Sequence, residues 1–116
     1  MDRYSRILLQ FVHTISNGLH DVEAFVFGTR LTRITKALER RRADDALDRA
    51  AKAVVDWEGG TRIGDSLDAF VRGWGRRGTS RGAIVVICSD GLDRGDPAVL
   101  AGAMERLGRL SHRIVW

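Results

Sequence analysis

Two loops of this 116-residue chain carry oxygen side chains of the kind that bind hard metal ions. Thr61 follows the adjacent glycines Gly59 and Gly60, and Asp90 lies in a Ser-Asp-Gly sequence directly after an apolar run. Adjacent glycines allow sharp backbone bends, so the first loop can present the Thr61 hydroxyl. A hydroxyl and a carboxylate suit Mg²⁺ or Mn²⁺, but such an ion needs more protein oxygens than these two residues provide. The pattern therefore predicts part of a divalent-cation site.

The apolar run before Asp90 predicts the strand around which the fold is organised. Residues 83–88 include four consecutive β-branched side chains and no charged one, which indicates a strand covered on both faces. In open α/β sheets, ligands bind where the strands deliver their carboxyl ends. Asp90 follows such an end and is therefore a candidate binding residue.

Strand and helix patterns alternate along the chain, which predicts an α/β fold with a largely parallel sheet flanked by helices. Further strands are expected at residues 22–27, 31–35 and 112–116. The second of these fits the return strand of a hairpin, and a loop leading into a helix fits it nearly as well. Helices are expected at residues 4–15, 43–55, 63–74 and 97–110, the last with Asp96 as its N-cap. Leu8, Phe11, Val12 and Ile15 form the predicted apolar face of the first helix.

Length and composition favour one domain over residues 1–116. The net charge of +4 comes almost entirely from arginines that alternate with acidic residues, a pattern typical of a solvated surface. The single cysteine, Cys88, cannot form an internal disulfide and is expected to be a small core residue in a reducing compartment. No segment approaches the roughly 18 apolar residues of a membrane span, and no signal-peptide pattern is present, so a cytoplasmic location is expected.

Three blocks of the chain together resemble a known family. FVFGTRLTRIT, WEGGTRIGDSL, and IVVICSDGLDRGDPAVL followed by HRIVW are similar in order and spacing to the von Willebrand factor A (vWA) domain of the CoxE-like family. The resemblance implies a Rossmann-like fold with a metal-ion-dependent adhesion site, built from an Asp-x-Ser-x-Ser loop, a Thr in a second loop and an Asp in a third. Thr61 matches the second element and Asp90 the third; in the family pattern the Thr contacts the metal directly and the Asp commonly acts through water.

The Asp-x-Ser-x-Ser element of the family pattern is missing from this sequence. Met1 stands where the Met after that element would stand, and the family continues beyond the strand at Ile114, so the resemblance implies a domain truncated at both ends. Loss of the first strand would expose strand edges, through which a homodimer could form. The chain as given is therefore expected to bind Mg²⁺ or Mn²⁺ weakly or not at all, whereas the complete domain would bind the ion and capture a partner's carboxylate.

The resemblance also implies a biological role. It predicts a non-enzymatic protein-interaction module that acts with a MoxR-type AAA+ ATPase in the maturation of a client metalloenzyme, such as carbon monoxide dehydrogenase. Neither a membrane nor a nucleic acid is an expected partner.

Two alternatives from other functional classes are open. Gly64-Asp65-Ser66-Leu67 spells the GDSL motif of a hydrolase family, in which Ser66 would be the nucleophile. Here the motif lies within a helical pattern, and the residue three positions before His112 is Arg109, not the required Asp. The second alternative is a basic nucleic-acid-binding surface. It would be formed by Arg40, Arg41, Arg42, Arg76, Arg77 and Arg81.

Overall fold

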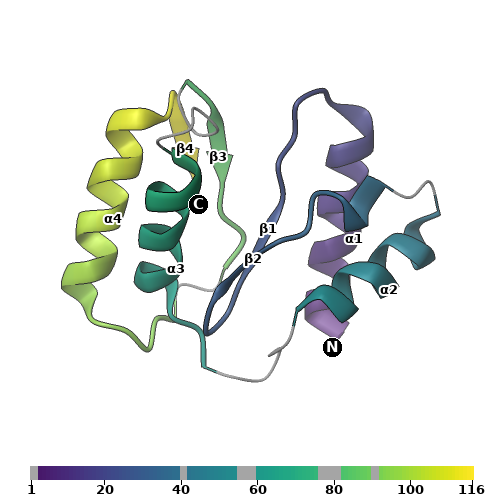
Figure 1. Cartoon of the computed structure of the whole chain (residues 1–116), viewed down its shortest axis with the longest axis horizontal. Helices are drawn as coiled ribbons and strands as arrows, with labels where there is room; N and C mark the ends of the chain where they lie inside the picture. Colours follow the sequence, from purple (N-terminus) through teal and green to yellow (C-terminus); the bar gives the residue numbers. More distant parts are fainter. Residues whose placement is uncertain (1–2, 40–41, 55–59, 76–81, 90–91) are drawn as a thin grey trace. The chain divides into compact units, whose positions relative to one another are not determined.

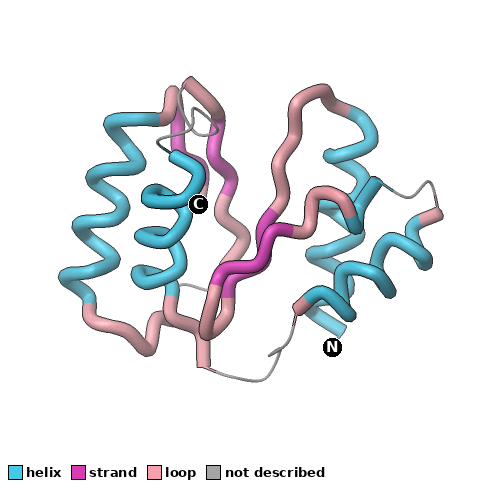
Figure 2. The backbone as a smooth tube through the Cα atoms, in the orientation of Figure 1, coloured by secondary structure: helices cyan, strands magenta, loops and turns pink. Residues whose placement is uncertain are grey.

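The computed structural model describes residues 3–39, 42–54, 60–75, 82–89 and 92–116 (Figures 1 and 2). The chain forms two compact units, which we describe separately. Unit 1 comprises Met1–Val26 and Thr32–Trp57, and unit 2 comprises Phe27–Leu31 and Glu58–Trp116. Each unit has its own cluster of buried apolar side chains.

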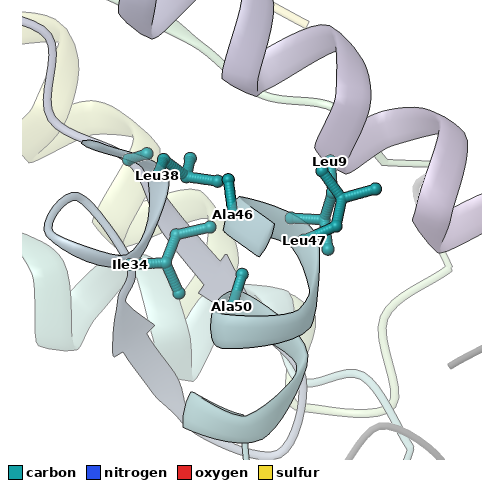
Figure 3. Packing of buried hydrophobic residues seen from close by; sticks show 7 residues of the cluster. Leu9, Ile34, Leu38, Ala46, Leu47 and Ala50 are labelled. Atoms are coloured by element: carbon teal, nitrogen blue, oxygen red, sulfur yellow. The ribbon is translucent and has the colours of Figure 1, made fainter. Parts of the chain in front are cut away.

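Helices α1 (Arg3–Gly18) and α2 (Ala43–Ala53) form unit 1 together with the short 3₁₀ helix η1 (Ala37–Glu39). The predicted helix at residues 4–15 is thereby confirmed, and the one predicted at 43–55 is confirmed over Ala43–Ala53. Asp44 and Asp45 lie in the first turn of α2 and Lys52 in its last, an arrangement that complements the helix dipole. Figure 3 shows residues of the core that these helices form together with Ile34, which follows β2: Leu9, Ile34, Leu38, Ala46, Leu47 and Ala50.

The apolar face predicted for α1 is wrong at one position. Phe11 is 51% exposed, whereas Leu9 and His13 are buried and Val12 packs against the same core. Leu9, Val12 and His13 have i, i+3, i+4 spacing and so share one side of a helix. The helix buries this side, which places Phe11 towards solvent.

Strands β1 (Phe25–Phe27) and β2 (Leu31–Arg33) pair in a two-stranded sheet. The hairpin interpretation of residues 22–35 is therefore confirmed, although both strands are shorter than predicted. Glu23, two residues before β1, accepts hydrogen bonds from Arg33 (2.8 Å and 3.1 Å) and from the Thr35 hydroxyl (2.7 Å). The hydrogen bond from Arg33, followed by that from Thr35, holds the pKa of Glu23 below its usual value, against the opposing effect of partial burial.

Unit 2 contains a strand–helix–strand arrangement covered by a second helix. Strand β3 (Ile84–Val86) pairs in parallel with β4 (Arg113–Val115), and α4 (Pro97–Leu110) connects them. Helix α3 (Ile63–Phe70), extended by the π-helical turn η2 (Val71–Gly75), packs against α4 (Figure 1). Asp96 caps α4 as predicted, because its side chain accepts a hydrogen bond from the Ala98 N–H at 2.9 Å.

The prediction that the strand at 83–88 is covered on both faces is wrong. Val85 and its register partner Ile114 pack into the core with α3 and α4. The neighbouring side chains of β3 point the other way, and Ile84 is 64% and Val86 54% exposed. The helices of unit 2 thus cover one face of this sheet, since side chains alternate between the two faces of a strand. Cys88 is a free, half-buried cysteine.

These elements make an α/β fold, as the sequence predicts. In the described part of the chain the strands form two small sheets, β1–β2 and β3–β4, where the sequence suggested a single sheet. Among the helices that the structure describes, none combines the length and the apolar character needed to cross a bilayer.

Candidate functional site

Three loops of unit 2 are tied together around Thr61. The Arg62 N–H donates to the carbonyl of Gly28, in the turn after β1, at 2.9 Å. The Arg94 N–H, in the loop after β3, donates to the carbonyl of Thr61 itself at 2.9 Å. Thr61 is half-buried at this junction. The loop that bears Thr61 is thus fixed by backbone hydrogen bonds to the loops that follow two different strands.

Asp93 adds a side-chain connection at the same place. Its Oδ1 accepts hydrogen bonds from the N–H of Ile63, the first residue of α3, and from the N–H of Gly95, both at 2.9 Å. The second of these closes a local Asx turn, while the first spans 30 positions of sequence. The start of α3 is therefore hydrogen-bonded to the loop after β3.

Two glycines allow this close packing. A Cβ on Gly60 would lie 2.3 Å from the Cδ of Arg94, a side chain that can move aside. A Cβ on Gly64 would lie 2.5 Å from the backbone N and 2.8 Å from the Cα of Leu100, which cannot move without shifting α4. Gly64 thus lets the first turn of α3 approach α4 closely, and this approach determines where the preceding Thr61 lies.

The two predicted metal ligands can be followed only in part. Thr61 lies in the junction just described, whereas Asp90 falls outside the residues that the structure describes. The distance between the Thr61 hydroxyl and the Asp90 carboxylate therefore stays a prediction. Within the described ranges, no group of three or more His, Cys, Asp or Glu residues is arranged to hold a metal ion.

The surroundings of Thr61 are chemically suited to a cation. The Oδ2 of Asp93 is buried and has no hydrogen-bond partner among the described residues. The carboxylates of Asp65 and Asp93 both lie near Gly95, where a Cβ would be 3.7 Å from Asp65 Oδ2 and 3.8 Å from Asp93 Oδ2. Asp65 is partly neutralised by Arg62 at 3.3 Å. A carboxylate oxygen without a donor, next to a threonine loop, fits the oxygen-rich shell of Mg²⁺ or Mn²⁺.

The hydrolase alternative is not supported by the position of its nucleophile. Ser66 lies within α3, is only 2% exposed, and its Oγ is buried without a hydrogen-bond partner in the described part of the chain. The hydroxyl is therefore not accessible to a substrate in this structure. The nucleic-acid alternative is untested, because of its six arginines only Arg42 is among the described residues.

Asp93 is the residue of this junction whose role sequence reasoning missed. Its position beside the Ser-Asp-Gly loop was evident, but its connection to Ile63 was not. The signal available in the sequence was Asp93-Arg94-Gly95, an Asp-x-Gly pattern typical of an Asx turn, which indicates an aspartate that organises its own loop.

Comparison with known protein families gives a match to the model described as VWA domain containing CoxE-like protein, over residues 1–116. Comparisons with curated proteins and with solved structures found no match. The family match spans all three sequence blocks, including the Thr61 loop and the loop after β3. This chain therefore belongs to the family of VWA domain containing CoxE-like proteins.

Proposed function

We propose that this chain is a non-enzymatic, metal-dependent protein-interaction module. In this proposal Thr61 and Asp90 supply oxygen ligands to Mg²⁺ or Mn²⁺, and the bound ion supplies a positive charge with an open coordination position for a partner's carboxylate. The observation that carries the proposal is the hydrogen bond from the Arg94 N–H to the Thr61 carbonyl, which joins the two ligand-bearing loops. Membership of the family supports the same function, because vWA domains generally act in binding, not in catalysis.

The proposed partner is a MoxR-type AAA+ ATPase, with which the module would act in the cytoplasm on a client metalloenzyme such as carbon monoxide dehydrogenase. This part of the proposal rests on the family resemblance. A partner that contributes a carboxylate would complete the ion's shell, so complex formation would require the divalent ion. A purified MoxR-type ATPase should therefore bind more weakly in the presence of EDTA and more weakly to a Thr61→Ala variant. Binding that is indifferent to both changes would contradict the metal-dependent capture.

The metal site itself can be tested on this chain by titration with Mn²⁺, followed by paramagnetic broadening of backbone amide signals. We expect broadening centred on Thr61 and Arg94, with an affinity weaker than micromolar because few protein ligands are available. Thr61→Ala should abolish the broadening. Thr14→Ala is the matched control, because it removes the same hydroxyl from the exposed side of α1, where it donates to the Gln10 carbonyl.

The titration can also refute the proposal. Broadening that spares Thr61 and is centred on exposed carboxylates of unit 1 would show that Thr61 is not a ligand. Micromolar or tighter binding would contradict the expectation that the ligand set of this chain is incomplete.

A further inference from the structure

Asp93 caps the N-terminus of α3 from a different loop. The N-cap residue of α3 is Arg62, whose side chain makes no capping hydrogen bond. The N–H of Ile63 is instead satisfied by Asp93 Oδ1 at 2.9 Å, from the loop after β3. A carboxylate is a strong acceptor at the positive end of a helix. The helix that follows Thr61 is thus capped by the loop in which the second predicted ligand lies.

This arrangement couples the position of Thr61 to that of the other loop. The Thr61 carbonyl accepts from the Arg94 N–H, and the Ile63 N–H donates to Asp93, so two antiparallel links flank Arg62. Two hydrogen bonds in opposite directions restrict both sliding and rotation of one loop against the other. Asp93 therefore limits how far the Thr61 side chain can move relative to residues 92–95.

The second carboxylate oxygen of Asp93, Oδ2, has no hydrogen-bond partner among the described residues. Oδ1 accepts both hydrogen bonds, while the buried Oδ2 accepts none. A buried acceptor without a donor costs folding free energy, on the order of 1–3 kcal/mol, unless a ligand or water satisfies it. Its neighbour Asp65 shares its charge with Arg62, but no cation partner of Asp93 is found in the described part of the chain. A metal-bound water is a donor of the right chemistry for this oxygen.

We propose that Asp93 is a positioning residue of the divalent-cation site: its Oδ1 clamps the Thr61 loop to the loop after β3, and its Oδ2 accepts a hydrogen bond from a water in the ion's shell. The second half of this inference rests on the proposed function. The first half concerns the metal-free protein and can be tested without any ion.

Two substitutions separate these halves. Asp93→Asn keeps an oxygen that can accept from Ile63 and Gly95, but it removes the charge and replaces Oδ2 by a donor. Asp93→Ala removes both functions. Asp96→Asn is the matched control: it removes the same charge from the same segment, and Asn remains a good N-cap for α4.

Amide hydrogen exchange of the metal-free protein tests the clamp. Asp93→Ala should accelerate exchange of the Ile63 amide by about fivefold or more, the loss expected when a helix cap is removed. Asp93→Asn should leave it within about twofold because the asparagine oxygen can still accept from the Ile63 N–H, and Asp96→Asn should do so because it leaves Asp93 in place. Unchanged exchange in Asp93→Ala would overturn the clamp.

Mn²⁺ broadening of the Thr61 amide tests the role of Oδ2. Asp93→Asn should weaken Mn²⁺ binding about tenfold, whereas Asp96→Asn should change it by no more than about twofold, since Asp96 is exposed and its charge is screened by solvent. Equal weakening in both variants would mean that net charge alone matters and would overturn the role of Oδ2. If Mn²⁺ broadens signals elsewhere in the wild-type chain and spares Thr61, the proposed function and the role of Oδ2 both fail, while the exchange measurement still decides the clamp.

Discussion

Replacement of Gly64 by alanine should destabilise unit 2, although alanine is the better helix former. Gly64 is buried in the first turn of α3, where an added Cβ would lie 2.5 Å from the backbone N and 2.8 Å from the Cα of Leu100. Carbon atoms in contact are ordinarily about 3.5–4 Å apart. Both opposing atoms belong to the backbone of α4, so no side-chain rotation can relieve the overlap, and the two helices must separate.

The magnitude follows from two opposing effects. Overpacking of this kind typically costs about 1–3 kcal/mol. The higher helix propensity of alanine offsets at most about 1 kcal/mol of that cost, and less in a first turn. We therefore expect a net loss of about 1–2 kcal/mol in the free energy of unfolding, which corresponds to a decrease in Tm of roughly 3–12 °C.

Urea unfolding followed by circular dichroism would measure this change, with Gly108→Ala as the control. Gly108 lies in α4 and a Cβ there would meet nothing within 4 Å, so the same substitution should stabilise the protein by about 0.5 kcal/mol. The two variants thus have the same chemistry and opposite expected signs. A Gly64→Ala protein as stable as Gly108→Ala would refute the close approach of α3 to α4 and, with it, our account of how Thr61 is positioned.

Two further predictions concern unit 1. Leu47→Ala should lower the free energy of unfolding by about 2–5 kcal/mol, because Leu47 is fully buried. Leu19→Ala, at an exposed position, should change it little. Thermal unfolding of both variants would show whether the core is correctly identified. The lowered pKa of Glu23 means that its interaction with Arg33 stabilises the fold above pH 4.5, the unfolded value, and that this stability is lost as the pH falls through the lower folded value. Glu23→Gln should therefore flatten the acid side of the stability–pH profile, and an unchanged profile would contradict the role of this pair.

Local signals in the sequence were sufficient for most of the elements. The cap of α4 follows from Asp96 and Pro97, because a capping side chain and the fixed φ of proline act within one turn. The Thr61 loop was identified from its adjacent glycines, which also act on the backbone within a few residues. The position of the Asp90 side chain cannot be compared with its prediction, since that residue lies outside the described ranges.

The contacts between distant segments were not predictable in this way. The spacing of apolar residues in α1 predicted a buried face that included Phe11. In the structure Phe11 is exposed, and Leu9 and His13 are buried in its place. The β-branched run at 83–88 indicated a strand, but its composition did not reveal that Ile84 and Val86 face solvent. Burial depends on what packs against an element, and its own residues do not specify that.

The sequence by itself determined the family, the alternation of helices and strands, and the loops in which the candidate ligands lie. Only the tertiary structure decided that Asp93 caps α3 from 30 positions away and leaves one carboxylate oxygen buried without a donor. The physical reason is the range of the interactions. Helix periodicity, caps and turns are set by residues within a few positions of one another, whereas this hydrogen bond exists only because the path of the chain brings the two loops together.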